Sequence, residues 1–79
     1  MEEWKLYDFS PFFKTCKEKG IKPIQLRKDK VVSGEVLAKM GRNEHVELRT
    51  IAKICKYLEV PIEKVVRIKY DEWTAALFR

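Results

Sequence analysis

The stretch VVSGEVLAKMGRNE, residues 31–44, decides the fold that this sequence is expected to adopt. Its apolar residues recur at the spacing of one helix face: Val32, Val36, Leu37 and Met40. Ser33 can cap such a helix and Gly41 can stop it, so the pattern predicts a helix over about Ser33 to Met40. The opposite side carries only small and charged residues. That side either reads DNA or is the solvated face of an ordinary packing helix.

Two helices are predicted before this stretch. Ser10 and Pro11 are typical of a helix start, and Gly20 ends that helix after Lys19. Its inner face is expected to hold Phe12, Phe13 and Cys16. Pro23 opens a second helix of about two turns, since a proline at the first helical position gives up no needed hydrogen bond.

Two more helices are predicted after the stretch, and the chain ends can pair as strands. A fourth helix begins near Glu47 and places these residues on one face: Leu48, Ile51, Ile54, Cys55 and Leu58. Pro61 starts a short fifth helix. Residues 4–7 and 65–70 alternate apolar and polar side chains or are β-branched, which favours a small antiparallel pair. The predicted fold class is therefore mostly all-α, a compact five-helix domain with a terminal β pair.

Positive charge is concentrated in the middle of the 79-residue chain. Residues 14–56 hold 12 Lys and Arg against 5 Asp and Glu, a net charge of +7. Residues 1–13 carry a net charge of −2, and residues 57–79 are neutral. A basic centre attracts phosphate and indicates nucleic acid as a partner. The alternative is a lysine-rich solvated face without a specific partner.

Several other classes of protein are disfavoured by the composition. Cys16 and Cys55 lie far apart and His45 is the only histidine, so Cys and His alone cannot supply four zinc ligands. Both cysteines are expected to be buried thiols. The absence of a signal peptide or transmembrane run favours a cytoplasmic protein without a membrane partner. No catalytic constellation is visible, so neither enzymatic activity nor a metal or cofactor is expected.

Residues 20–65 resemble the lambda-repressor/Cro (Xre-like) helix-turn-helix family, in particular its short single-domain regulators. The resemblance lies in Leu26-Arg27, Ser33, Val46, Leu48, Ile54-Cys55, Leu58 and, most specifically, Leu37-Ala38-Lys39-Met40-Gly41-Arg42-Asn43-Glu44. It extends over about residues 10–68 without a gap. It implies one helix-turn-helix domain over residues 1–79, with terminal extensions at 1–9 and 69–79.

The sequence departs from the family pattern at two positions. The family's turn glycine falls at Val31, and the threonine before it falls at Lys30. A β-branched residue is costly at positive φ, so either the turn differs or Val31 is strained. The polar residue that often opens the second helix and contacts phosphate falls at Pro23, which has no N–H to donate.

The resemblance places the helix near residues 33–40 in the major groove, where its first two turns face base edges. The base-facing residues are then Ser33, Gly34, Glu35, Ala38 and Lys39. Gly34 and Ala38 allow close approach, but the set contains few bidentate readers. Modest direct readout is expected, with more weight on phosphates and DNA shape.

Phosphate contacts are expected on both sides of this helix, at Lys22, Lys28, Arg42, Asn43 and His45. Each has an alternative interpretation. Lys28 can be a solvated helix residue, Asn43 a turn former beside Gly41, and His45 an ordinary loop residue. Arg27 can pair with Asp29 or Glu44 rather than reach DNA.

The predicted function is a sequence-specific DNA-binding regulator, with repression as the expected mode because occupying a promoter needs no chemistry. A core of this size supplies only roughly 3–5 kcal/mol, which favours a homodimer on double-stranded DNA. Dimer contacts are expected from residues near the chain ends: Trp4, Tyr70, Trp73, Leu77 and Phe78. These side chains can instead cover the domain's own core. The alternative function is a protein-interaction module on the same fold, such as an antitoxin or a phage or mobile-element inhibitor or adaptor.

Overall fold

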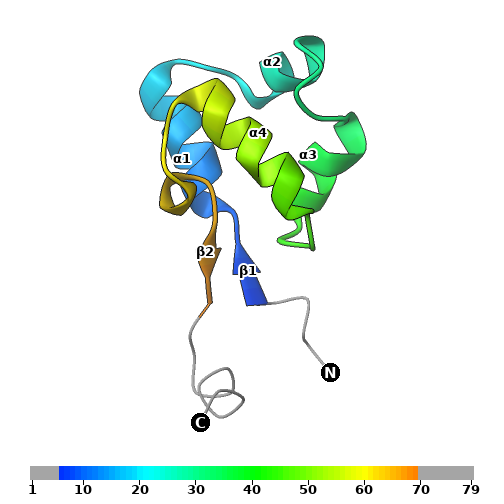
Figure 1. Ribbon diagram of the computed structural model, residues 1–79, viewed down its shortest axis with the longest axis vertical. Helices are drawn as coiled ribbons and strands as arrows, with labels where there is room; N and C mark the ends of the chain where they lie inside the picture. Colours follow the sequence, from blue (N-terminus) through cyan, green and yellow to red (C-terminus); the bar gives the residue numbers. More distant parts are fainter. Residues whose placement is uncertain (1–5, 70–79) are drawn as a thin grey trace, which may run out of the picture.

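A computed structural model describes residues 6–69, which form four α-helices, one 3-10 helix and a two-stranded antiparallel sheet. In chain order the elements are β1 (Tyr7–Asp8), α1 (Ser10–Lys19), α2 (Pro23–Lys28), α3 (Gly34–Gly41), α4 (Leu48–Leu58), η2 (Ile62–Lys64) and β2 (Arg67–Ile68). Figure 1 shows α4 in the middle of the helical part, with α1 on one side and α3 on the other. The β1–β2 ribbon extends away from the helices (Figure 1).

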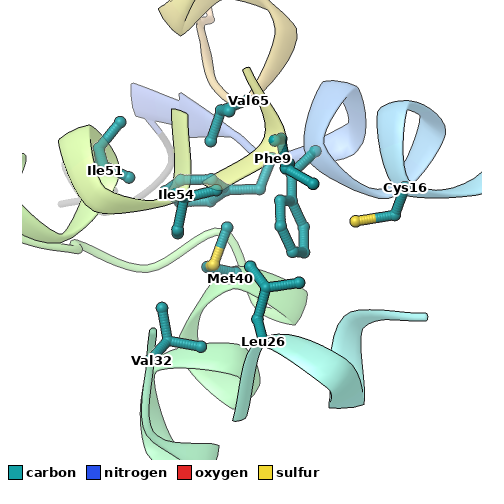
Figure 2. Close-up of a cluster of buried hydrophobic side chains, with 10 residues drawn as sticks. Phe9, Cys16, Leu26, Val32, Met40, Ile51, Ile54 and Val65 are labelled. Atoms are coloured by element: carbon teal, nitrogen blue, oxygen red, sulfur yellow. The ribbon is translucent and has the colours of Figure 1, made fainter. Parts of the chain in front are cut away.

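The buried apolar side chains of residues 6–69 gather in one cluster to which all four α-helices contribute. Its members are Phe9, Phe12, Cys16, Leu26, Val32, Met40, Ile51, Ile54, Leu58 and Val65. Figure 2 shows Leu26 from α2 and Met40 from α3 pointing into it from one side, opposite Phe9 and Ile54. The core therefore holds α2 and α3 in fixed positions against α1 and α4.

Two residues predicted to face the core lie at the surface. Leu48 is 71% exposed and Phe13 is 38% exposed. Leu48 is the first residue of α4, and Phe13 lies in α1. Helical spacing identifies the face of a helix but not how far the neighbouring elements cover each residue of that face, so the prediction was wrong at these positions.

All four α-helices end in the same way, on a residue with positive φ: Gly20, Lys30, Asn43 and Glu59. In each case the following N–H donates to the carbonyl five residues back: Ile21 to Cys16, Val31 to Leu26, Glu44 to Lys39 and Val60 to Cys55. This is the Schellman arrangement, which satisfies carbonyls that the helix end would leave unpaired. Gly20 ends α1 as predicted. Gly41 does not end α3 through positive φ, since it is the last residue of the helix and Asn43 adopts that conformation.

The turn between α2 and α3 explains the departure from the family pattern at Val31. Positive φ, 59°, occurs at Lys30 and not at Val31. The Lys30 N–H donates to the Arg27 carbonyl at 3.0 Å, and the Val31 N–H donates to the Leu26 carbonyl at 2.8 Å. Val31 is half-buried against the core. The turn geometry thus differs from the one expected, and the unfavourable backbone conformation falls on a lysine.

The predicted pairing of the chain ends is confirmed within the described residues. Tyr7 pairs with Ile68 and Asp8 with Arg67 in the antiparallel ribbon. Asp8 is buried, and its Oδ1 accepts from the Ser10 N–H at 3.0 Å and the Ser10 hydroxyl at 2.6 Å. Its Oδ2 accepts from Arg67 Nε at 3.1 Å. Hydrogen bonds from Ser10, followed by those from Arg67, lower the pKa of Asp8 from 3.8 to about 2.

Two other details correct the expectations, and one expectation falls on residues that the structure does not describe. The fifth helix is a single 3-10 turn, Ile62–Lys64, so residues 6–69 contain four α-helices rather than five. Ser10 lies inside α1, whose N-cap is Phe9, and the side chain that bonds the first turn is that of Asp8. Trp4, Tyr70, Trp73, Leu77 and Phe78 lie outside the described residues.

Candidate nucleic-acid interface

The outer side of the helix α3 carries three small residues and two charged residues of opposite sign. Ser33 is its N-cap, and the Ser33 Oγ accepts a hydrogen bond from the Val36 N–H at 3.2 Å. Met40 is fully buried, which fixes the inner side of the helix. Ser33, Glu35 and Ala38 are exposed, and Gly34 and Lys39 are half-buried. The five residues predicted to face bases therefore belong to one short segment whose accessible members are mostly small.

The two charged residues on this outer side neutralise each other. Lys39 Nζ lies 3.5 Å from Glu35 Oε1, one helical turn apart. Such exposed pairs contribute about 0.3–0.5 kcal/mol, so an incoming DNA phosphate or base can compete for either partner. Lys39 is thus available to DNA only at the expense of its contact with Glu35.

The loop after α3 holds a second, tighter ion pair. Arg42 Nε donates to Glu44 Oε2 at 2.8 Å and Arg42 Nη2 donates to Glu44 Oε1 at 3.2 Å. These hydrogen bonds raise the pKa of Arg42 above its ordinary value and lower the pKa of Glu44. Both side chains remain at the surface, so the pair orients the guanidinium rather than burying it.

Asn43 and His45, in the same loop, already have partners within the protein. The Asn43 side-chain oxygen accepts a hydrogen bond from the Phe9 N–H at 2.9 Å, and its backbone has a φ of 57°. Asn43 is therefore a turn former that fastens the loop to the start of α1. His45 Nδ1 lies 3.3 Å from the Tyr7 hydroxyl on the ribbon. Only the amide N–H₂ of Asn43 and the far nitrogen of His45 are left for a ligand.

The segment directly before α3, which comprises α2, its N-cap and the turn, carries an excess of positive charge. Residues 22–30 contain Lys22, Arg27, Lys28 and Lys30 against Asp29, a net charge of +3, whereas residues 31–45 contain two Lys or Arg and two Glu and are neutral. The Tyr57 hydroxyl donates to Asp29 Oδ2 at 2.5 Å, which raises the pKa of Tyr57. Within residues 6–69, the four basic side chains make no ion pair and are exposed.

Arg27 adopts a position that the sequence reasoning missed. A Cβ built on Gly34 would lie 3.4 Å from Arg27 Cζ and Nε and 3.5 Å from Nη1. The guanidinium therefore lies over the first residue of α3. Neither predicted partner of Arg27 holds it, because Asp29 bonds Tyr57 and Glu44 bonds Arg42. The feature of the sequence that could have indicated this contact is the combination of a long basic residue near the end of α2 and a glycine at the start of α3.

A helix-turn-helix with basic residues on its first helix and a small outer side on its second is the arrangement that places a helix in the major groove. A family model described as the Cro/C1-type HTH DNA-binding domain matches residues 14–69. The chain belongs to this family.

A solved structure supports the same assignment. The Cro/C1-type chain is similar to a structure titled "Crystal structure of transcriptional regulator VanUg, Form II", with 26% identity and a TM-score of 0.75. The alignment covers 82% of this chain and 87% of the VanUg chain. No match was found among curated proteins.

Among residues 6–69, no three His, Cys, Asp or Glu side chains come together as a set of metal ligands. No helix in the same part of the chain is long and apolar enough to cross a membrane.

Proposed function

We propose that the protein is a sequence-specific transcriptional repressor that inserts α3, with its N-cap Ser33, into the major groove of double-stranded DNA. The observation that carries the proposal is the division of charge: exposed basic residues at positions 22–30, which make no ion pair within residues 6–69, directly precede the small outer side of α3 in the chain. Phosphate anchors beside a groove-entering helix fix its register on the duplex. Repression follows from occupying a promoter in the cytoplasm and requires no catalysis.

The side chains divide into two groups in this proposal. Ser33, Gly34, Glu35, Ala38 and Lys39 face base edges, where Gly34 and Ala38 permit close approach and Lys39 exchanges Glu35 for a guanine or a phosphate. Lys22 and Lys28 bind phosphate directly, since no ion pair within residues 6–69 has to be broken first. Arg42 binds phosphate after leaving Glu44, while Asn43 and His45 contribute their remaining donors.

The protein acts as a homodimer in this proposal. Leu48, Ile62 and Ile68 are exposed around a groove of about 250 Å³, lined by apolar side chains, Tyr7 and His45. None of the groove's lining residues is Lys, Arg, Asp or Glu, in a chain in which 37% of residues are charged. The protein has a net charge of +5, so two copies repel each other electrostatically. This repulsion is smaller when the copies meet through an uncharged apolar face than when they meet through a charged one. The terminal residues Trp4, Tyr70, Trp73, Leu77 and Phe78 can extend the interface.

The test is fluorescence anisotropy with DNA from upstream of the protein's own gene and with a scrambled duplex, at low and physiological salt. We expect preference for the upstream DNA and a steep salt dependence, with each phosphate contact contributing a slope of about −0.9. Lys28→Ala should weaken binding to all sequences and reduce the slope. Lys64→Ala is the matched control, because Lys64 is an exposed lysine on η2, on the other side of α4 from α3.

One observation favours a second function, a protein-interaction module. The charged residues of α3 and its following loop neutralise each other in the pairs Glu35–Lys39 and Arg42–Glu44, which leaves no net charge on the segment expected to enter the groove. Failure to bind either duplex at low salt would rule out the regulator and favour this alternative, for example an antitoxin or a phage inhibitor or adaptor.

A further inference from the structure

The first turn of α3 lacks a side chain that can recognise a base pair with two hydrogen bonds. It offers the hydroxyl of Ser33, which caps the helix, no side chain at Gly34 and the carboxylate of Glu35. Specific contacts in the major groove come mostly from long side chains, and arginine to guanine is the commonest. A helix that reads DNA from this position therefore needs a donor from elsewhere.

The structure places such a donor on α2. The distances of 3.4 to 3.5 Å between Arg27 and a Cβ built on Gly34 are ordinary contact distances. The Arg27 guanidinium therefore lies beside the first residue of α3, at van der Waals distance from the position of an alanine Cβ at residue 34. Because residue 34 is glycine, no side chain separates the guanidinium from the start of the helix.

The three carboxylates of residues 29–44 each have a partner other than Arg27. Asp29 accepts from the Tyr57 hydroxyl at 2.5 Å, and Glu35 pairs with Lys39 at 3.5 Å. Glu44 holds Arg42 through two hydrogen bonds. Within residues 6–69, the side chain of Arg27 makes no hydrogen bond or ion pair, and Arg27 is exposed. Its N–H donors are available to an external acceptor.

We propose that Arg27 is a specificity-determining residue that donates two hydrogen bonds to O6 and N7 of a guanine in the major groove. The planar fork of a guanidinium matches this pair of acceptors. Guanine is favoured over phosphate because the guanidinium lies over the start of the groove-entering helix. The inference rests on the proposed function, since it requires α3 in the groove.

The experiment begins with selection of binding sites from a random duplex library by the wild-type protein. Binding of the selected site is then measured for the wild-type protein and for Arg27→Ala, with each base pair changed in turn. At one guanine, changing the base should cost the wild-type protein about tenfold to a hundredfold in affinity and cost Arg27→Ala little. Replacing that guanine by 7-deazaguanine, which lacks the N7 acceptor, should weaken the wild-type protein only.

Lys28→Ala is the matched control, because Lys28 is the next residue and is also exposed and basic. It should weaken all sequences alike and keep the guanine preference. Circular dichroism checks that both variants remain folded. If Arg27→Ala weakens all sequences alike with a shallower salt slope, Arg27 contacts phosphate and the inference is wrong. If Arg27→Ala has no effect, Arg27 lies outside the interface. If the wild-type protein selects no sequence, the proposed function itself fails.

Discussion

Replacing Lys30 by glycine should make the protein more stable. Lys30 has a φ of 59°, in the left-handed region, which costs an L-residue roughly 1–2 kcal/mol relative to glycine. A glycine at residue 30 offsets about 0.5–1 kcal/mol of this gain in stability, because glycine gives the unfolded chain more conformational freedom. The Lys30 side chain is exposed and makes no ion pair within residues 6–69. The expected net gain for Lys30→Gly is therefore about 0.5–1 kcal/mol.

Two further variants isolate the backbone effect. Lys30→Ala removes the same charge but keeps a Cβ, so its stability should stay within about 0.5 kcal/mol of the wild-type protein. Val31→Gly removes a half-buried side chain that packs on the core, at a residue without positive φ. It should lower the free energy of unfolding by about 1–2 kcal/mol, because apolar contacts are lost and chain entropy is gained by the unfolded state.

The measurement is thermal and urea unfolding of the three variants and the wild-type protein, followed by circular dichroism. For a domain of this size, a gain of about 0.5–1 kcal/mol corresponds to a rise in Tm of roughly 3–6 °C for Lys30→Gly. The family pattern, which aligns its turn glycine with Val31, leads to the opposite order. A stabilised Val31→Gly together with an unchanged Lys30→Gly would refute the Schellman ending of α2 at Lys30.

Three other predictions follow from single residues. Asp8, with a pKa lowered to about 2 in the folded protein, stabilises the fold above about pH 4, and this contribution is lost as the pH falls from 4 through 2. Asp8→Asn should therefore lower the free energy of unfolding, measured by urea titration, by about 1–2 kcal/mol at pH 7 and by little at pH 2. An equal decrease at both pH values would exclude the ionised carboxylate as the cause. Gly41→Ala should raise the free energy of unfolding by about 0.5–1 kcal/mol, because Gly41 is helical and an added Cβ meets nothing within 4 Å. A lower Tm for this variant would contradict the open space around Gly41. Leu48→Lys places a charge in the proposed dimer face without disturbing the core, so sedimentation should show a shift to monomer, whereas an unchanged dimer would place the interface elsewhere.

The α-helices could be predicted from the sequence, because the signals that start and end them are local. Proline at the start of α2, Ser33 as the cap of α3 and Gly20 at the end of α1 act through the backbone of their own turn. The apolar spacing of residues 31–44 likewise identified the inner side of α3, where Met40 is buried. A helix-turn-helix could be predicted on these grounds, since each signal depends on neighbours within about four residues.

Which side chains remain free at the candidate interface depends on contacts between residues that are distant in the sequence. Val31 packs against the core after α2, and the Asn43 side chain accepts a hydrogen bond from the Phe9 N–H at the start of α1. With these contacts, positive φ occurs at Lys30 and Asn43 and not at Val31 or Gly41. Asp29 is taken by Tyr57, a residue 28 positions away. Among the described residues 6–69, Arg27 has no hydrogen-bond or ion-pair partner and lies over Gly34. Contacts across a turn depend on the angle between two helices, which the packed core sets and a local pattern does not encode.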